Sequence, residues 1–382
     1  MKKILFIDTG LEYGGGTKSF LYLLGALSSK NEYKIYVYFE NDYMVGDKKI
    51  SSIIESYGAK FIYFEHKKRI CKFKKELLRL FSKKLLDKVL YKNDLDFAIK
   101  LFNNIGTNIN SSYELNKKID INLVHLNNHF STNLAYNEAA NLLGIKVIQH
   151  LRKNSKIEDF KLSKLKKLSF LAISVSNSTY DFYANQMEIS KNIVYNPVIY
   201  SGLATNQHLD NSDISIIMPA NFLSLKGHSL VFDAFLGLKR DDVKLYLAGG
   251  EVDKKLIQKL QILEEQGKVK YLGFIKNMDE IYAKSDYILG FSSDEGLPRV
   301  VIEGLSAGLG VIYSDIPVIK EIYNISSNKD NFHIVKRDSA SLLECLKKLK
   351  KPLSKEPDMA IISNFSLENY LCKIEKIYKD YL

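Results

Sequence analysis

Residues 292–308 read SSDEGLPRVVIEGLSAG and directly follow an apolar run at 287–291. This order predicts a buried strand, a loop and a helix start. Gly296 permits the backbone angles of a tight turn, and Pro298 suits the first helical position because its missing N–H would have no partner there. The free amides at such a helix start carry the positive end of the helix dipole, so the segment suits sugar hydroxyls or a diphosphate.

Two glutamates flank this turn, with Glu295 in the loop and Glu303 in the expected helix. Two carboxylates can accept hydrogen bonds from vicinal hydroxyls, and each charge-assisted contact contributes about 1.5 to 3 kcal/mol. The alternative interpretation is a solvated loop carboxylate followed by an ordinary helical ion pair between Arg299 and Glu303 at i, i+4 spacing.

The chain has 382 residues, more than one hydrophobic core usually supports, and this length predicts two domains. Strand-like and helical patterns alternate over 1–199, and a second series fills 213–365, as expected for parallel sheets covered by helices. The polar stretch 200–212 is the expected linker. The expected strands are 4–8, 34–39, 60–64, 121–126, 146–150, 170–175, 192–195, 214–218, 244–248, 269–271, 287–291, 310–313 and 333–335, and the expected helices of the first domain are 17–29, 50–57, 131–143 and 178–185.

A last helix at 366–382 has apolar residues on one face, and we expect it to pack back on the N-terminal domain. Two successive doubly wound units also predict a cleft in which ligands bind at the carboxyl ends of both sheets. Such a cleft suits a reaction between two substrates.

The composition is that of an ordinary globular protein, with 46% hydrophobic and 26% charged residues. The three cysteines, Cys71, Cys345 and Cys372, are far apart, which favours neither a disulfide framework nor a zinc site and fits a reducing cytoplasm. No apolar run reaches the roughly 18 residues of a transmembrane helix, and the run near the N-terminus is too short for a signal peptide. Any membrane contact is therefore expected to be peripheral.

The net charge of +11 favours anionic partners, and much of the excess lies in the basic segment 67–92. One interpretation is an exposed basic face on a helix whose other side packs on the first domain. The other is a face that rests on anionic lipid and gives access to a lipid-linked acceptor. Nucleic-acid binding is disfavoured because the segment has no recognised nucleic-acid motif and its basicity is not matched by stacking aromatic residues.

The two glutamates closely resemble the EX7E motif of glycosyltransferase family 4, whose members are retaining enzymes of the GT-B type. This resemblance extends over most of the chain and is strongest over 214–321. It implies an α/β GT-B fold, in which two Rossmann-like doubly wound domains face each other across a cleft. It also implies that Glu303 holds the ribose hydroxyls of a nucleotide-sugar donor and that Glu295 faces the transferred sugar. The donor-binding residues implied around them are Gly296, Leu297, Pro298 and Arg299.

The second segment that carries the resemblance is IIMPANFLSLKGHSLVFDAF at 216–235. The resemblance implies that Lys226 neutralises the diphosphate as it departs. Family members usually have Gly-Arg at the positions of Ala220 and Asn221, so Asn221 leaves the phosphate clamp with one cation fewer. A lysine before a glycine at a helix start is otherwise a common surface residue.

Further positions follow from the same resemblance. Gly249 lies in a loop that is expected beside the nucleotide base, where backbone near Phe274 also meets the base. Plain chain turning would explain the glycine equally well. Asp286, which precedes the strand before the glutamate motif, is interpreted as structural, and so is the hinge-like sequence Asn-Pro-Val at 196–198.

In the first domain, Gly15 and Gly16 belong to a glycine-rich loop that resembles the family's loop approaching the donor phosphate and the acceptor. The loop is not a GxGxxG or Walker pattern, and a plain turn is the alternative. His150 ends an expected strand and matches the histidine that faces the donor sugar. A packed or capping histidine is the alternative for that position.

Three alternative interpretations concern a metal site, an oxidoreductase and a non-catalytic binding protein. Asp94 and Asp96 form a DxD tripeptide, but they lie in a helical pattern and not after a buried strand, so no metal site is expected. A nicotinamide-dependent oxidoreductase would need GxGxxG after the first strand, which is absent, and only Glu40 matches its second requirement. A non-catalytic nucleotide-sugar-binding or scaffold protein remains the main alternative.

The resulting hypothesis is a retaining, metal-independent glycosyltransferase. It would transfer a sugar from a UDP- or GDP-sugar to a saccharide or lipid-linked saccharide in bacterial lipopolysaccharide or capsule biosynthesis. The acceptor hydroxyl would attack on the face from which the diphosphate leaves, so no protein nucleophile is required. No cofactor or nucleic-acid partner is expected, and the expected location is the cytoplasm, at the inner face of the cytoplasmic membrane if the basic segment binds lipid.

Overall fold

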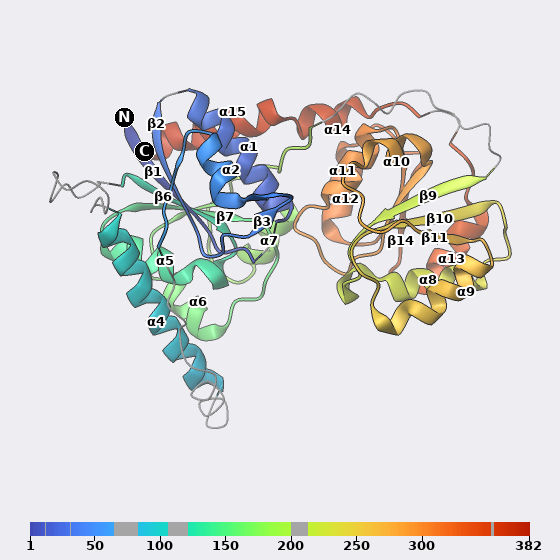
Figure 1. The fold of residues 1–382 in the computed structure, drawn as a ribbon, viewed down its shortest axis with the longest axis horizontal. Helices are drawn as coiled ribbons and strands as arrows, with labels where there is room; N and C mark the ends of the chain where they lie inside the picture. The colour runs from blue at the N-terminus through green and yellow to red at the C-terminus, as the bar shows by residue number, and fades with distance from the viewer. Residues whose placement is uncertain (12, 31, 65–82, 106–120, 200–212, 353–354) are drawn as a thin grey trace. The chain divides into compact units, whose positions relative to one another are not determined.

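The chain folds into two compact α/β units. The computed structural model describes residues 1–11, 13–30, 32–64, 83–105, 121–199, 213–352 and 355–382 (Figure 1). Unit 1 comprises Met1–Val194 with Leu371–Leu382, and unit 2 comprises Tyr195–Tyr370. The expected linker at 200–212, the portion 67–82 of the basic segment and Cys71 lie outside the described residues.

Unit 1 is built on a parallel sheet with the order β5-β2-β1-β6-β7-β8. The sheet is filled outward from β1 in both directions, so the chain order reverses between β1 and β6. In open α/β sheets the loops at this switch point form the usual ligand site. The strands are β1 (Lys2–Asp8), β2 (Tyr33–Phe39), β5 (Lys60–Phe61), β6 (Leu123–Asn128), β7 (Lys146–Leu151) and β8 (Leu171–Ser174).

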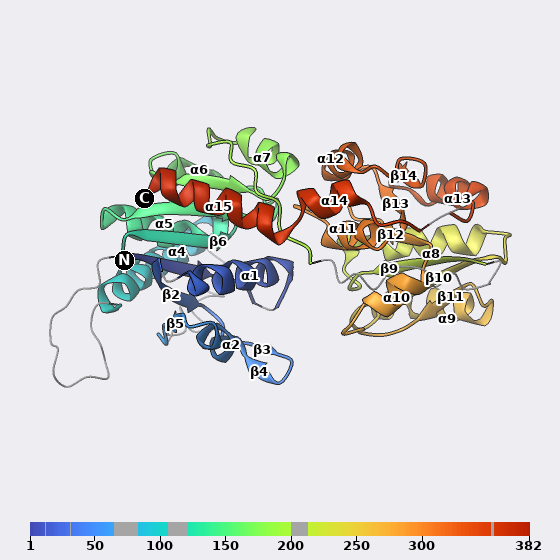
Figure 2. The ribbon, with the colours of Figure 1, turned by 90° about the horizontal axis from the view of Figure 1, so that it is seen from above.

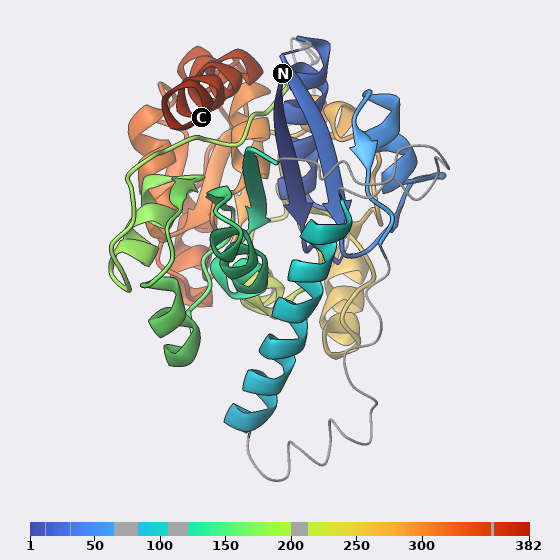
Figure 3. The same cartoon turned by 90° about the vertical axis from the view of Figure 1, so that its left-hand side faces the viewer.

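Helices cover both faces of this sheet, which explains why its central strands are buried along most of their length and not on alternate residues. Leu5 and Ile7 of β1 pack in one cluster with residues of α4 and α5. Phe6, which points to the other face, contacts Phe20 of α1. The helices are α1 (Gly15–Ser29), α2 (Ile50–Ser56), α4 (Lys83–Asn104), α5 (Phe130–Leu142), α6 (Asp159–Leu165) and α7 (Asn177–Ala184), and a hairpin of β3 (Met44–Val45) and β4 (Lys48–Lys49) precedes α2 (Figures 1 and 3).

Unit 2 repeats the arrangement with the order β11-β10-β9-β12-β13-β14, all parallel. Its switch point lies between β9 and β12. Two doubly wound α/β units were predicted from the alternating patterns, and this prediction is confirmed. The strands are β9 (Ile214–Pro219), β10 (Val243–Ala248), β11 (Val269–Tyr271), β12 (Tyr287–Gly290), β13 (Gly310–Ser314) and β14 (Phe332–Val335).

The core of unit 2 lies between its sheet and the helices α8, α9 and α13, where Phe232, Phe235 and Leu342 pack against the central strands. Ile288 of β12 points to the opposite face and meets α11 at Gly304. The helices are η1 (Ser224–Lys226), α8 (His228–Gly237), η2 (Lys254–Leu256), α9 (Ile257–Glu265), α10 (Asp279–Lys284), α11 (Arg299–Ser306), α12 (Pro317–Ile325), α13 (Ser339–Lys348) and α14 (Met359–Asn364).

The last helix, α15 (Leu367–Tyr381), begins in unit 2 and continues into unit 1 (Figure 2). Its second half is bound to unit 1 by polar contacts. The Tyr378 hydroxyl lies 2.6 Å from His125 Nδ1, and Lys30 Nζ donates to Glu375 at 2.5 Å. Residues 192–195, expected as a strand, form only one bridge, between Ile193 and Ser174.

The Asn-Pro-Val segment belongs to unit 2, which begins at Tyr195, whereas the sequence placed the boundary at 199. The Tyr195 hydroxyl donates to Glu321 at 2.7 Å, and the Val198 amide donates to the Phe365 carbonyl at 2.9 Å. The Pro197 carbonyl accepts from Arg299 Nη1 at 2.8 Å. These contacts fix the segment on unit 2 and support its interpretation as structural.

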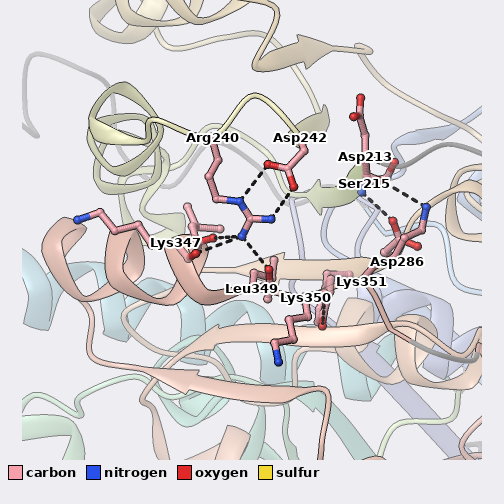
Figure 4. A network of polar contacts seen from close by, with 11 residues as sticks. Asp213, Ser215, Arg240, Asp242, Asp286, Lys347, Leu349, Lys350 and Lys351 are labelled. Atoms are coloured by element: carbon pink, nitrogen blue, oxygen red, sulfur yellow. Dashed lines mark hydrogen bonds and ion pairs between the residues drawn. The ribbon is translucent and has the colours of Figure 1, made fainter.

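Polar side chains brace the amino-terminal edge of the unit 2 sheet, the edge opposite the usual ligand site (Figure 4). Asp286 Oδ2 accepts from the Ser215 amide at 2.8 Å, and Lys355 Nζ lies 3.3 Å from Asp286 Oδ1. Arg240 binds Asp242 and donates to the carbonyls of Leu346, Lys347 and Leu349 at the end of α13. Asp286 is therefore placed where a structural role was expected.

Asp358 is a buried carboxylate that joins two helices. It caps the N-terminus of α14 through the Ile361 amide and also accepts from Ser326 Oγ at 2.6 Å and the Ser327 amide at 2.9 Å. Burial alone would raise the pKa of Asp358, but these hydrogen bonds outweigh it and hold the pKa below its ordinary value of 3.8. The folded state therefore binds the Asp358 proton less readily than the unfolded state does.

We expect Asp358→Asn to destabilise the protein in a pH-dependent way. A carboxylate whose folded pKa is depressed stabilises the fold above its unfolded pKa, and that stability is lost as the pH falls through the folded pKa. The deficit of the variant should be on the order of 2 kcal/mol at pH 6 and should shrink below about pH 4. Thermal unfolding from pH 3 to pH 6 measures it. Asp253→Asn, which removes the exposed cap of η2, is the control and should show little pH dependence.

Candidate active site

Two loops meet at the switch point of unit 2. One follows β9 and contains η1, and the other follows β12 and leads into α11. Because β9 and β12 are parallel neighbours, these loops leave the sheet side by side at its carboxyl edge. Lys226 Nζ from the first loop donates to Glu295 Oε1 of the second at 2.5 Å, and the two side chains are 26% and 17% exposed. The structure thus brings together Lys226 and Glu295, which the sequence had singled out separately.

The position of Lys226 is fixed by a close approach of backbone. Gly227 has φ +78°, and a Cβ there would lie 2.4 Å from the Phe291 carbonyl oxygen, so no other residue fits without movement. The Ser293 amide donates to the Leu225 carbonyl at 2.9 Å, which joins the two loops directly. Arg337 Nε donates to the Phe291 carbonyl at 2.9 Å. The lysine is therefore held by the same contacts that shape the loop carrying Glu295.

Glu295 is supported from behind by two hydroxyl groups. Ser292 Oγ donates to Glu295 Oε1 at 2.7 Å, and the Tyr313 hydroxyl lies 3.4 Å from the same oxygen. The Tyr313 ring occupies the space that a side chain at Gly290 would need, because a Cβ there would lie 2.0 Å from the ring. Burial and the nearby Glu295 raise the pKa of Tyr313 well above its ordinary value, so its hydroxyl stays protonated.

Glu303 projects from the second turn of α11 and has two neighbours. The Tyr282 hydroxyl donates to Glu303 Oε2 at 3.1 Å, and Arg299 Nη2 lies 3.7 Å from Oε1. The i, i+4 pair with Arg299 is therefore present. Since the Arg299 side chain is largely buried and also binds the Pro197 carbonyl, it is not an ordinary solvated pair.

The start of α11 differs by one residue from the expected one. Pro298 is the N-cap, with ψ at 92° in the extended region, and Arg299 is the first helical residue. Pro298 therefore precedes the helix because its backbone is still extended. No side chain caps this end, and Gly296, Leu297 and Pro298 are buried around it.

Three other predicted donor-binding residues lie near the carboxyl ends of β9, β10 and β11. Asn221 Oδ1 accepts from the Gly250 amide at 2.9 Å, so this side chain links the loops after β9 and β10. Gly249 lies against the Ala220 carbonyl. Phe274 is 79% exposed, which leaves its ring available to a ligand. Asn221 thus holds two loops together, whereas the arginine usual at this position in the family would have supplied a cation.

The predicted site residues of unit 1 lie at its own switch point. Gly15 and Gly16 are the first residues of α1, so the helix begins before Thr17, where the sequence placed it. The N-cap is Gly14, and no side chain caps this end. The side chain of Arg152 lies against Gly16. The glycine-rich loop thus ends in a helix start next to a buried guanidinium.

His150 is fully buried in a polar network and has no exposed surface. Its Nδ1 lies 3.3 Å from both His125 Nε2 and Arg152 Nη2. Burial, followed by the Arg152 charge, lowers the pKa of His150 well below its ordinary value, so the ring is neutral at physiological pH. This placement supports the packed histidine that the sequence left open as an alternative.

The same network contains residues that sequence reasoning missed. Asp8 at the end of β1 accepts from Asn127 Nδ2 at 2.5 Å and from Asn128 Nδ2 at 3.1 Å. Asn127 also accepts from Arg152 Nε. Asn128 has φ +100°, a strained conformation for a residue other than glycine. The available signal was that Asp8 and both asparagines end neighbouring parallel strands.

Residues 205–362 match the family model described as glycosyl transferases group 1. The matched residues lie within unit 2. A search of curated proteins finds a Campylobacter jejuni relative that is 25% identical over 167 residues, covering 42% of this chain and 46% of the relative. It is named N-acetylgalactosamine-N,N'-diacetylbacillosaminyl-diphospho-undecaprenol 4-alpha-N-acetylgalactosaminyltransferase. The chain thus spans about half the length of the curated relative it matches.

Solved structures match over the whole chain and share the fold. A glycosyltransferase from Rickettsia africae has a TM-score of 0.75 at 18% identity and covers 100% of this chain and 98% of its own. The Anabaena protein Alr3699/HepE in complex with UDP-glucose has a TM-score of 0.70 at 16% identity, with 100% of both chains covered. Together with the two doubly wound units, these matches confirm the prediction of the GT-B fold.

The region that matches the family model contains the predicted Lys226, Glu295 and Glu303, all close to the switch point of unit 2. Within the described parts of the chain, no group of three or more His, Cys, Asp or Glu residues is arranged to hold a metal ion. Asp94 and Asp96 lie within α4 of unit 1. No helix among the described residues is long and apolar enough to cross a membrane.

Proposed function

We propose that the protein is a retaining glycosyltransferase that moves a sugar from a UDP- or GDP-sugar to a saccharide or lipid-linked saccharide acceptor. The observation that carries this proposal is the pairing of Lys226 with Glu295 at the switch point of unit 2, one helix turn and a loop away from Glu303. A cation and two carboxylates at this place suit the diphosphate and the hydroxyls of one elongated ligand.

Each residue has a role that follows from its chemistry. Glu303 can accept hydrogen bonds from the two ribose hydroxyls, and Glu295 can accept from hydroxyls of the transferred sugar. Lys226 can bind the diphosphate as a compact positive charge. Lys226 and Glu295 neutralise each other in this structure, so donor binding would replace this contact with one between Lys226 and phosphate.

The reaction would proceed on one face of the sugar. The bond from the anomeric carbon to the diphosphate oxygen breaks as the acceptor oxygen forms its bond on the same side, and the departing phosphate takes the acceptor proton. The stereochemistry is then retained without a protein nucleophile. Lys226 would stabilise the negative charge that develops on the leaving diphosphate.

The acceptor and the biological setting are proposed from the name of the relative and from the net charge. The Campylobacter relative is named for an undecaprenol-linked acceptor, and the net charge of +11 would favour an anionic membrane face. A role in lipopolysaccharide, capsule or another bacterial surface glycan would fit both. The enzyme would then work at the inner face of the cytoplasmic membrane and contact it peripherally.

We expect the reaction to need no metal ion, because Lys226 and backbone amides can supply the positive charge that the diphosphate requires. Transfer should therefore continue at an unchanged rate in excess EDTA. The measurement is initial rate with and without chelator, followed by addition of Mn²⁺ or Mg²⁺. A rate that disappears with EDTA and returns only with added metal would contradict this part of the proposal.

A screen of nucleotide sugars tests the proposal as a whole. A ligand at 100 times its dissociation constant adds about 2.7 kcal/mol to the free energy of unfolding, so the true donor should raise the melting temperature clearly. The stabilising donor is then incubated with the protein, and release of the sugar is followed. Stabilisation without transfer or hydrolysis would favour a non-catalytic binding protein. No stabilisation by any UDP- or GDP-sugar would count against the proposed donor.

A further inference from the structure

Tyr282 is a buried residue whose hydroxyl reaches the proposed donor site. It lies on α10, the short helix that precedes β12, and only 4% of its surface is exposed. Its hydroxyl is 3.1 Å from Glu303 Oε2. Sequence analysis assigned no role to Tyr282. Burying a phenol group requires a partner for the hydroxyl, and here that partner is the carboxylate proposed to bind ribose.

The direction of this hydrogen bond is fixed. Burial, followed by the charge of Glu303, raises the pKa of Tyr282 well above its ordinary value. The phenol therefore keeps its proton and can donate it to the carboxylate at any physiological pH. A hydroxyl that always donates holds Glu303 Oε2 in place. It thereby restricts rotation about the last side-chain bond of the glutamate, whose torsion angle otherwise has a broad, roughly two-fold distribution.

The contacts of Glu303 leave room for two more donors. An ionised carboxylate offers about four acceptor positions. Tyr282 takes one at Oε2, and Arg299, whose other terminal nitrogen is bound to the Pro197 carbonyl, lies 3.7 Å from Oε1. The Glu303 side chain is 24% exposed, so a ligand can reach it. Two remaining positions on an oriented carboxylate match the two hydroxyls of a vicinal diol.

We propose that Tyr282 is a positioning residue for Glu303 and that its hydroxyl sets how strongly the domain prefers a ribose over a deoxyribose nucleotide. The proposal deepens the proposed function and rests on it, because it takes Glu303 as the ribose ligand. Without the phenol hydroxyl, the carboxylate can turn toward Arg299 and present its oxygens at angles that no longer match both ribose hydroxyls. Binding of the diol should weaken, whereas binding of a nucleotide that lacks one hydroxyl should change little.

The test compares two nucleotides and two tyrosine variants. Dissociation constants of UDP and 2′-deoxy-UDP are measured by calorimetry for the wild type, Tyr282→Phe and Tyr287→Phe. Tyr287 is the matched control, since it is also buried in unit 2 and its hydroxyl donates to the Lys350 carbonyl at 2.8 Å, away from the site. We expect Tyr282→Phe to weaken UDP binding about 10-fold, or about 1.4 kcal/mol, and 2′-deoxy-UDP binding less than about 3-fold. Tyr287→Phe should leave the ratio of the two constants at the wild-type value.

Each outcome bears on the role of Tyr282 or on the ribose contact of Glu303. A wild-type ratio in folded Tyr282→Phe, or an equal loss of preference in Tyr287→Phe, would overturn the role of Tyr282 while leaving the proposed donor in place. Failure of the wild type to bind either UDP or GDP, or to prefer the nucleotide that it binds over the 2′-deoxy form, would overturn the ribose contact of Glu303 itself and the inference with it. If Tyr282→Phe does not fold, Glu303→Asp retracts the carboxylate from the phenol with Tyr282 intact. The ratio should then fall as well, and an unchanged ratio would overturn the proposal.

Discussion

Replacing Lys226 with alanine is expected to lower the turnover number by a factor of about 10² to 10³, the usual cost of removing one group that stabilises charge in the transition state. The lysine is the cation that the two loops at the switch point hold beside Glu295. Its loss should change stability little, because a partly exposed ion pair contributes only about 1 kcal/mol or less. Steady-state kinetics and thermal unfolding of the same preparation measure both effects.

Lys259→Ala is the matched control for this variant. Lys259 also pairs with a carboxylate at 2.5 Å, that of Asp233, but on the exposed surface of α8 and α9. Its removal should leave the turnover number at the wild-type value. Equal turnover of Lys226→Ala and wild type would contradict the role of Lys226. A variant that loses activity only because it unfolds would instead give Lys226 a structural role.

Replacing Glu303 with glutamine is expected to weaken UDP binding by a factor on the order of 100. The variant keeps the shape of the side chain but removes the charge and turns one acceptor oxygen into an NH₂ donor. Two charge-assisted hydrogen bonds to ribose, each contributing about 1.5 to 3 kcal/mol, would be weakened together. The dissociation constant of UDP, measured by calorimetry, reports this loss without the need for an acceptor.

Glu344→Gln provides the control for Glu303→Gln. Glu344 is an exposed carboxylate on α13 that pairs with Lys347 at 2.7 Å at i, i+3 spacing. Its replacement should leave UDP binding unchanged. If Glu303→Gln binds UDP as tightly as the wild type, Glu303 does not hold the ribose, and its contacts with Arg299 and Tyr282 are then structural.

The sequence predicted the fold well because the central strands of both units are largely buried and contain short apolar runs. β12, for example, follows directly from the run at 287–291. Short edge elements were harder to predict. β5 covers only Lys60–Phe61 of the expected 60–64, and residues 192–195 form a single bridge, since an edge position gives little periodic signal. Pro298 lies outside α11 because its backbone is extended, so the helix begins one residue later than expected.

The candidate site was likewise predictable only in part. The loops that carry Lys226 and Glu295 could be predicted, because glycine, proline and charged residues follow directly after apolar strands. Their supporting residues could not, since Tyr282 and Tyr313 come from other elements and look like ordinary core tyrosines. Gly290, the last residue of the apolar strand β12, was the available hint that a ring packs there. Which hydroxyl meets which carboxylate depends on the packing of side chains from separate helices and strands.

The central claim is that the loops after β9 and β12 bind one nucleotide sugar, with Glu303 on the ribose and Lys226 on the diphosphate. The most direct measurement is a crystal structure of the protein soaked with UDP or the donor that the screen identifies. We predict ribose hydroxyls within hydrogen-bond distance of Glu303 and phosphate oxygens beside Lys226, which would then have left Glu295. A nucleotide bound elsewhere, with both glutamates turned to solvent, would contradict the account.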